Sequence, residues 1–357
     1  MRRVTVNCSS NYDVVIGKGI LDETGRLTKQ VCPKAQKVLI VSESNVAPLY
    51  MDRVKSSLTG EGFAVFEYVF EAGEQSKNIA SISGMWGVMA SNGFTRTDIV
   101  LALGGGVTGD MAGFAAATFL RGIKVIQVPT SLLAMVDACI GGKTGIDLPQ
   151  GKNQVGAFHQ PSIVIEDTSC LDTLPDSVFT EGMGEVLKYA YIMDTELYEI
   201  LSGAEDKADI RKNSNLIEDI IARCAYDKAY VIGEDENDNG LRQTLNFGHT
   251  VGHVIERDSN FTLAHGVCVA KGMGIIIRAS VLSGKLDKDK ADKMISLIEA
   301  YGLPSEDDIT PEEAREGVLN DKKKRGDTIS VILVTDIGRS EICKMTADEF
   351  LQFLKRK

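Results

Sequence analysis

The first half of the chain alternates between short apolar runs and longer helix-like segments, and this alternation limits the possible folds more than any other feature. Segments with helical character lie at 47–60, 76–91 and 109–120. The runs between and around them are rich in valine and isoleucine and lie at 4–8, 12–17, 37–43, 63–70, 98–103, 123–128 and 162–166. Strands that alternate with helices are typical of βαβ units. We therefore predict an α/β domain with a largely parallel sheet.

The pattern changes from about residue 177, where helices dominate. A pair of strands is expected near the end, at 328–335 and 339–343. The helical stretches lie at 178–193, 194–203, 207–234, 246–257, 266–284 and 287–301. A chain of 357 residues is long enough for two domains. We predict an α/β domain over 1–176 and a mostly α-helical domain over 177–357.

The balance of charges narrows the classes of partner. The chain has 50 Asp and Glu against 39 Lys and Arg, for a net charge of −11, which disfavours binding to nucleic acid or to an anionic membrane. No uninterrupted run of 18 apolar residues is present, and the opening MRRVTVNCSS has no apolar core of a secretory signal. The seven cysteines have no CxxC spacing and are expected to be reduced thiols. We expect a cytoplasmic protein.

A glycine-rich loop follows the predicted strand 98–103. Gly104–Gly109 fits the pattern GxGxxG, and an alanine-rich helix follows it. Glycines let the backbone approach a phosphate, and the helix N-terminus adds N–H donors. The usual dinucleotide fingerprint needs an acidic residue about 20 positions later, and none occurs between Asp110 and Asp137. The loop therefore favours a nucleotide site of a non-standard kind, with a tight strand-to-helix turn as the alternative.

A second glycine-rich segment, Asp137–Gly145, nearly matches the P-loop pattern. That pattern requires glycine where Asp137 stands, which argues against an ATPase. Lys143 and Lys152 lie in glycine-rich stretches, and Asn153 follows directly. Two lysines placed in this way suit an anionic ligand, although ordinary solvated lysines would give the same pattern.

Three of the four histidines lie within seventeen residues. His249 and His253 are spaced i, i+4, which places both on one face of a helix, and His265 follows twelve residues later. Two or three converging imidazoles can bind a divalent metal such as zinc. The glutamate of the peptidase motif HExxH is absent, and Glu185 is a candidate for a further ligand. Arg242 would lie on the same side if the helix extended back to it. His159 has no assigned role.

Taken together, these segments resemble the 3-dehydroquinate synthase family. The resemblance runs from Asn45–Tyr50 to Asp336–Gly338, and its motifs are Gly104–Asp110, Pro129–Ser131 with Asp137, Gly141–Gly145, Gly151–Asn153, Glu185 with Lys188, and Asn246–His253 with His265. It implies an N-terminal α/β domain that binds NAD, a C-terminal helical domain that binds one divalent metal, zinc or cobalt, and a homodimer. It also implies the conversion of 3-deoxy-D-arabino-heptulosonate 7-phosphate into 3-dehydroquinate and phosphate. The implied steps are transient oxidation, β-elimination of phosphate, re-reduction, ring opening and aldol closure.

The resemblance also implies roles for individual residues. Glu185, His249 and His265 match the metal ligands, and His253 matches a proton relay. Positions implied in catalysis, substrate binding or both are Lys143, Lys188, Arg242, Asn246, Arg121, Asp137, Asn153, Lys228, Lys322 and Lys323. Positions implied in NAD binding are Glu43, Asn45, Glu74, Lys77, Gly105, Gly106, Val107, Asp110, Thr130, Ser131, Asp137, Lys152 and Thr173.

Three positions depart from the family pattern. Glu43 stands where aspartate is common, and Asp238 stands where a glutamate usually precedes Gly-Leu-Arg. Gly184 replaces a common alanine beside Glu185, which is expected to loosen its helix by about 1 kcal/mol.

Three other functions are compatible with parts of this pattern. A sedoheptulose 7-phosphate cyclase on the same scaffold would have no substrate carboxylate to bind, so Lys152, Asn153 and Arg242 argue against it. A metal-dependent polyol dehydrogenase would need few cations for its uncharged substrate, whereas lysines and arginines occupy many motif positions here. A non-catalytic protein on the same scaffold would tolerate loss of the metal ligands, and all of them are present.

Overall fold

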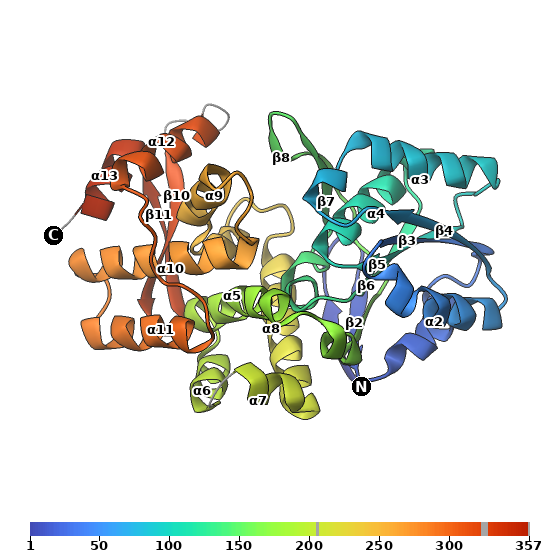
Figure 1. Cartoon of the computed structure of the whole chain (residues 1–357), viewed down its shortest axis with the longest axis horizontal. Helices are drawn as coiled ribbons and strands as arrows, with labels where there is room; N and C mark the ends of the chain where they lie inside the picture. Colours follow the sequence, from blue (N-terminus) through green and yellow to red (C-terminus); the bar gives the residue numbers. More distant parts are fainter. Residues whose placement is uncertain (205–206, 323–327, 356–357) are drawn as a thin grey trace. The chain divides into compact units, whose positions relative to one another are not determined.

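The computed structural model describes residues 1–204, 207–322 and 328–355. Their contacts divide the chain into two units, which we describe separately (Figure 1). The first unit consists of Met1–Pro175 and Ser214–Glu236, and the second consists of Asp176–Asn213 and Asn237–Lys357. Helix α8 (Ser214–Glu234), which we had expected in the second domain, is therefore grouped with the first. It contacts β1 and β2, and its apolar face, which includes Ile217 and Ile221, is buried there.

The core of the first unit is a seven-stranded sheet in the order β1-β2-β9-β6-β5-β3-β4. The pair β1–β2 is antiparallel, and all other neighbouring strands of this sheet are parallel. The prediction of a largely parallel sheet is therefore confirmed. Every predicted apolar run forms a strand, with ends that shift by at most two residues. The strands are β1 (Arg2–Val6), β2 (Tyr12–Gly17), β3 (Lys37–Glu43), β4 (Ala64–Phe70), β5 (Ile99–Gly104), β6 (Lys124–Pro129) and β9 (Val164–Asp167).

Helices cover both faces of this sheet. Helices α3 and α4 pack on the face that presents Leu39, Val41 and Val100. Helix α2 joins β3 to β4, whereas α3 and α4 join β4 to β5 and β5 to β6, in the opposite direction along the sheet. Because right-handed crossovers in opposite directions lie on opposite faces, α2 covers the other face. The helices of the unit are α1 (Thr24–Val31), α2 (Ala47–Gly60), α3 (Ile79–Ser91), α4 (Gly106–Thr118) and α8, with short helices η1 (Ile20–Glu23), η2 (Glu74–Ser76), η3 (Phe119–Arg121), η4 (Ala134–Ala138) and η5 (Thr168–Thr173).

The strand order places the predicted nucleotide residues at one edge of the sheet. The neighbouring parallel strands β3 and β5 end at Glu43 and Gly104, and β6 ends at Pro129. The chain leaves β3 toward β4 and later returns to the other side of β3 as β5. Such a switch point is where ligands bind in open α/β sheets, at the carboxyl ends of the strands.

The glycine-rich segment after η4 forms a two-stranded hairpin that the sequence analysis did not predict. Strands β7 (Lys143–Leu148) and β8 (Gly151–Phe158) are antiparallel, and Gly145 lies opposite Gly156. A Cβ atom at Gly145 would come within 2.8 Å of the Val155 carbonyl oxygen, and one at Gly156 within 2.1 Å of the Thr144 carbonyl oxygen. The glycines therefore permit a close approach of the strands, and they also weaken the alternating pattern that predicts a strand.

The second unit is mostly helical, as predicted, and the expected pair of strands is confirmed as an antiparallel hairpin. Two helices near the C-terminus, α12 and α13, had not been predicted. The elements are α5 (Asp176–Ile192), α6 (Thr195–Gly203), α7 (Lys207–Lys212), η6 (Leu241–Asn246), α9 (His249–Asp258), α10 (His265–Leu282), α11 (Lys288–Ala300), α12 (Pro311–Lys322), β10 (Ile329–Asp336), β11 (Arg339–Met345) and α13 (Ala347–Lys355).

Two predicted helices are shorter than expected. The stretch 207–234 is divided at Asn213 into α7 and α8. The stretch 246–257 begins as a helix only at His249, because Gly248 adopts a left-handed conformation with φ 79° and separates α9 from η6. Arg242 and Asn246 therefore lie on a short helix of their own, and the continuous helix that would have placed Arg242 beside His249 is not formed.

Helix α10 is the central helix of the second unit and contacts α5, α9 and α11. A Cβ atom at Gly266 would lie 2.0 Å from the Glu181 carbonyl oxygen of α5, and one at Gly272 would lie 2.0 Å from the Gly248 carbonyl oxygen. A Cβ atom at Gly184 would lie 2.6 Å from the Gly266 carbonyl oxygen. Gly184 is therefore more than a weak helix former, since it lets α5 and α10 meet. These glycines bring the helices that carry Glu185, His249 and His265 together.

Helix α10 is also long and apolar enough to cross a membrane, by length and composition alone. Its mean hydropathy is 1.4, and 61% of it is buried inside the structure. Lys271 and Arg278 interrupt its apolar residues. Its central position in the second unit accounts for its apolar character, because the core helix of a folded domain needs the same composition.

Candidate active site

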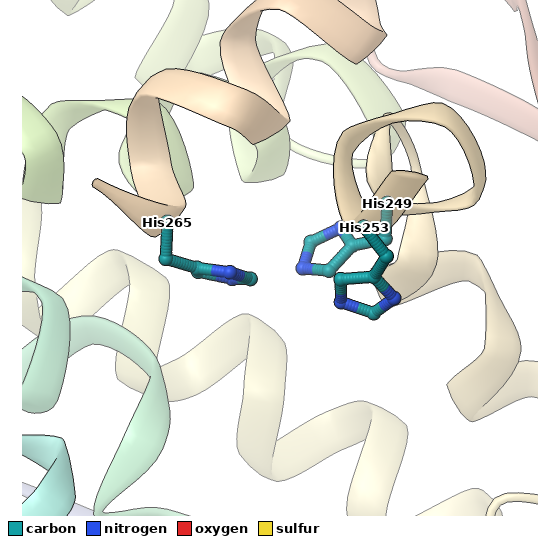
Figure 2. Close-up of side chains that lie close together, drawn as sticks. All are labelled: His249, His253 and His265. Carbon is teal, nitrogen blue, oxygen red and sulfur yellow. The ribbon is translucent and has the colours of Figure 1, made fainter. Parts of the chain in front are cut away.

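The three clustered histidines converge in the second unit. His249 is the first residue of α9, His253 lies one turn later, and His265 is the first residue of α10. Figure 2 shows the three rings facing one another from these two helices. Their candidate ligand nitrogens all lie within 4.8 Å of one another. Such convergence is what a metal site requires.

Glu185 of α5 lies between two of these histidines. Its Oε1 atom is 3.5 Å from His249 Nε2 and 3.4 Å from His265 Nε2, and its side chain is only 1% exposed. Its other oxygen, Oε2, is in contact with the Lys188 ammonium. Two imidazoles and one carboxylate form a donor set that suits zinc or cobalt and leaves open positions for substrate oxygens. The residues present therefore fit a divalent metal.

The two histidines beside Glu185 are oriented by their other ring nitrogens. His249 Nδ1 lies 3.0 Å from the Phe247 carbonyl oxygen, and His265 Nδ1 lies 3.3 Å from Glu256 Oε2. An Nδ1–H that donates to such an acceptor leaves the Nε2 lone pair available to a metal. Both Nε2 atoms face Glu185. The sequence analysis missed Glu256, although its spacing of i+3 from His253 and i+7 from His249 places it on the same side of α9.

The charged groups of this cluster influence one another. Burial alone would raise the pKa of Glu185, but Lys188 and His249 lower it well below its usual range, so the carboxylate is ionised. Partial desolvation of its ring by surrounding groups, together with the neighbouring rings of His249 and His265, lowers the pKa of His253 to about 3. His253 itself is exposed. A neutral, exposed imidazole beside a metal site is able to accept a proton from a substrate hydroxyl.

The other predicted residues of the second unit lie on nearby elements or outside the described structure. Lys188 is 1% exposed, and its Nζ atom lies 5.0 Å from the centre of the Tyr189 ring. Arg242 is buried on η6, and Asn246 closes that helix. Lys322 is the last residue of α12, but its side chain is not described, and Lys323 lies outside the described residues.

The predicted nucleotide loop begins α4 in the first unit. Gly105 is the N-cap, and Gly106 and Val107 form the first turn. The Thr130 N–H donates to the Gly104 carbonyl oxygen at 3.0 Å, and a Cβ atom at Gly105 would lie 3.4 Å from Ser131 Oγ. The loops after β5 and β6 therefore lie side by side. Helix N-terminal N–H groups next to a hydroxyl form a suitable cradle for a pyrophosphate.

Several predicted cofactor and substrate residues form a single network around Lys77. The buried Lys77 ammonium donates to Asp110 Oδ2 at 2.7 Å and to Asn153 Oδ1 at 2.6 Å. Glu74 Oε1 is 3.7 Å from both Lys77 Nζ and Lys152 Nζ. The network joins η2, α4 and the β7–β8 hairpin. Sequence spacing did not indicate these contacts, because the three segments are far apart along the chain.

A second pair links Asp137 and Lys228. Asp137 belongs to η4, which is a π-helix, and the Lys228 ammonium donates to both the carboxylate and the backbone carbonyl of Asp137. Single π-helical turns occur often at functional sites. Lys228 lies on α8, which comes about 90 residues after Asp137 in the sequence. The contact therefore joins two predicted substrate residues that are distant along the chain.

The remaining predicted residues lie at separate places of the first unit. Glu43 accepts the Asn45 backbone N–H at 2.6 Å, at the end of β3. The Thr173 hydroxyl contacts the Tyr50 hydroxyl. Arg121, the last residue of η3, is exposed and adopts a left-handed conformation with φ 69°. Lys143 is the exposed first residue of β7.

One buried acid near η4 had no place in the sequence analysis. Glu166 of β9 is 0% exposed, and its Oε1 atom accepts a hydrogen bond from the Cys139 thiol at 3.6 Å. Its Oε2 atom is buried without a hydrogen-bond partner among the described residues. Burial raises the pKa of Glu166 well above its ordinary value, so the folded protein retains a proton there that the unfolded chain releases above about pH 4.3.

Replacing Glu166 by glutamine is expected to stabilise the protein, by a margin that grows with pH. The native protein loses stability as pH rises from the unfolded pKa toward the raised folded pKa, and the amide does not titrate. Each pH unit above the unfolded pKa costs the native protein about 1.4 kcal/mol until the folded pKa is reached, so the gain near neutral pH should be about 1–3 kcal/mol. Urea unfolding at about pH 5 and about pH 8 measures it. The exposed Glu61→Gln serves as control, and a Glu166→Gln margin that stays constant or shrinks with pH would contradict the expectation.

Comparison with known proteins agrees with this arrangement. The family model for the 3-dehydroquinate synthase N-terminal domain matches residues 67–181, and the model for the C-terminal domain matches residues 182–324. A 3-dehydroquinate synthase from Streptococcus suis (strain 05ZYH33) is 41% identical over 357 residues, which covers 99% of both chains. The chain belongs to the 3-dehydroquinate synthase family.

Solved structures of two related enzymes share the fold. A 2-deoxy-scyllo-inosose synthase in complex with carbaglucose-6-phosphate, NAD+ and Co2+ superposes with a TM-score of 0.88, at 22% identity and 99% coverage of both chains. The 2-epi-5-epi-valiolone synthase ValA from Streptomyces hygroscopicus subsp. jinggangensis 5008, with NAD+ and Zn2+ bound, gives a TM-score of 0.87 at 26% identity, with 99% of this chain and 98% of that chain covered. The fold class predicted from the sequence is therefore confirmed.

Proposed function

We propose that this chain is an enzyme that converts 3-deoxy-D-arabino-heptulosonate 7-phosphate into 3-dehydroquinate and phosphate, with NAD and one divalent metal as cofactors. The observation that carries the proposal is the convergence of Glu185, His249 and His265, with His253 beside them, in a chain of the 3-dehydroquinate synthase family. NAD and a divalent metal bound in the related ValA structure support the choice of cofactors.

When bound, NAD takes up and returns a hydride, and the metal acidifies a substrate hydroxyl. Glu185, His249 and His265 would hold the metal, and the glycine loop at Gly105 and Gly106 would receive the pyrophosphate of NAD. His253 would take the proton of the hydroxyl that is oxidised, since it is neutral and exposed. Oxidation would make the neighbouring C–H acidic, so that phosphate would leave by elimination. The hydride would then return to the oxidised carbon, and ring opening and aldol closure would follow.

The cationic residues would bind the two anionic groups of the substrate. The predicted set is Lys143, Lys152, Lys188, Lys228, Arg242 and Arg121, with Asn153 and Asn246 as neutral partners. A substrate with a carboxylate and a phosphate requires such cations, although the whole chain carries a net charge of −11. Positive charge that is confined to the site attracts the substrate while the remaining surface stays acidic.

Release of inorganic phosphate from the heptulosonate phosphate tests this proposal. Metal-stripped enzyme should show no release, and full activity should return only when NAD and zinc or cobalt are added together. NAD should act catalytically, so no net NADH should accumulate. A steady rise of NADH with simple polyols would instead identify a dehydrogenase. Preference for sedoheptulose 7-phosphate over the carboxylate substrate would identify the related cyclase.

We also propose that the enzyme is a cytoplasmic homodimer. The resemblance to the family supports the dimer. The thiols support the compartment, because none of the seven cysteines forms a disulfide in the structure, as expected for a reducing environment.

A further inference from the structure

We propose that Glu256 is a positioning residue for the metal ligand His265, and that its carboxylate sets the affinity of the site for divalent metal. This inference rests on the metal site proposed above. Glu256 lies on α9, whereas His265 begins α10. The Glu256 side chain is 7% exposed, and its Oε2 atom lies 3.3 Å from His265 Nδ1. One buried carboxylate therefore connects the two helices that carry the histidines.

The geometry determines which nitrogen of His265 faces the site. An ionised carboxylate has no proton to donate and can only accept hydrogen bonds. His265 Nδ1 must therefore carry the proton in this contact. Nε2, which lies 3.4 Å from Glu185 Oε1, is then the nitrogen whose lone pair a metal bound beside Glu185 would take up. Loss of Glu256 would remove the contact that favours this tautomer of His265 and holds the plane of its ring. If the His265 ring had to be oriented when the metal binds, the cost of ordering it would lower the affinity of the site for the metal.

The two metal-facing histidines differ in the acceptor that orients them. His249 Nδ1 contacts a neutral backbone carbonyl, that of Phe247, while His265 Nδ1 contacts a charged carboxylate. A charge-assisted hydrogen bond is stronger than a neutral one and makes the opposite nitrogen a better electron donor. Glu256 should therefore influence the metal more than the backbone contact of His249 does.

A second glutamate contacts the backbone of His265. The Glu181 carboxylate accepts hydrogen bonds from the backbone N–H groups of His265 and Gly266, at the start of α10. The position of the His265 backbone is thus set from α5, and the orientation of its ring is set from α9. Loss of Glu256 should leave α10 in place, so its effect should appear in metal binding rather than in folding.

The test is the zinc affinity of metal-stripped protein, measured by competition with a chromophoric chelator. Glu256→Ala is expected to weaken zinc binding about 10–100-fold, the usual effect of losing a carboxylate behind a ligating histidine. Glu256→Gln keeps the size and one acceptor oxygen and should recover part of the affinity. With cobalt in place of zinc, the visible absorption spectrum should change in Glu256→Ala, because the ligand field depends on the orientation of His265.

The matched control is Asp258→Asn, which removes one negative charge two residues later on the same helix. Asp258 is exposed and pairs with Arg257 at 3.0 Å, so its variant should bind zinc like the native protein and keep the native cobalt spectrum. If Glu256→Ala does not fold, Glu256→Gln alone decides the question. Its zinc affinity must then be more than about twofold below that of Asp258→Asn.

Two outcomes separate this inference from the proposed metal site. If His249→Ala and His265→Ala bind zinc as tightly as the native protein, the metal site itself is wrong. If those variants lose zinc while Glu256→Ala and Glu256→Gln stay within twofold of the native affinity, the metal site stands and the role of Glu256 is overturned. A parallel loss in Asp258→Asn would also overturn it, since bulk charge would then explain the effect.

Discussion

Replacing His265 by alanine is expected to lower kcat/KM for phosphate release by on the order of 10³-fold, with a loss of zinc affinity of similar size. The proposed metal has only three protein ligands, and His265 Nε2 is one of the two imidazole nitrogens that face Glu185 Oε1. A site left with Glu185 and His249 would hold the cation weakly and would no longer orient two substrate oxygens. Activity at limiting zinc should fall most, with partial recovery at high zinc.

The control for this experiment is the histidine outside the cluster. His159 lies in the first unit, and its Nε2 atom is 2.8 Å from the Ile123 carbonyl oxygen. His159→Ala should lower zinc affinity by less than twofold. Unchanged turnover of His265→Ala at limiting zinc would show that the metal assignment is wrong, whereas equal losses in both variants would indicate a general effect of histidine removal on the fold.

Replacing Lys77 by methionine is expected to lower the free energy of unfolding by about 2–4 kcal/mol. Lys77 is 4% exposed and is the cation between Asp110 and Asn153. Methionine fills similar space, but it leaves the Asp110 carboxylate without its ammonium partner in a partly buried site. The estimate lies below that of a fully buried pair, because 23% of the Asp110 side chain is exposed. Urea unfolding gives this quantity, and KM for NAD should rise in the same variant.

A second substitution identifies the cause of this loss. In Lys77→Met/Asp110→Asn the orphaned charge is removed as well, so a large part of the stability should return. Lys55→Met is the surface control: Lys55 pairs with Glu67 at 2.6 Å, but 47% of its side chain is exposed. Its unfolding midpoint should not change. If Lys77→Met behaves like Lys55→Met, the network contributes little to stability.

Strand positions in the first unit were predictable from the sequence because buried parallel strands are continuous apolar runs. The β7–β8 hairpin was not predictable in this way. Its Gly145 and Gly156 are needed for close contact between the strands, and glycine carries no hydrophobic signal. The helix boundary at Gly248 was missed for a related reason. Glycine allows both helix and turn, and the turn is packed closely against α10, where Val269, Gly272 and Met273 lie next to Gly248.

The site was predictable where residues are close in sequence. The spacing of His249 and His253 already indicates one helix face. The contact between Glu185 and His265 depends on how α5 and α10 pack, so the residues alone indicated it only as one possibility, and the family resemblance was needed to select it. The buried Glu256 and Glu166 and the half-buried Glu181 were missed because such carboxylates are recognised by their surroundings, which a sequence does not contain.

The path of the chain has a consequence for biosynthesis. The first unit lacks α8 until residue 234 has been made, and α8 supplies both the cover for β1 and β2 and the Lys228 partner of Asp137. A ribosome that has synthesised only the first 175 residues has therefore produced a sheet with part of its apolar surface uncovered. Chaperone binding to stalled nascent chains should be strongest over this interval, and a fragment that ends at Pro175 should be insoluble unless the segment Ser214–Glu236 is supplied as a separate peptide.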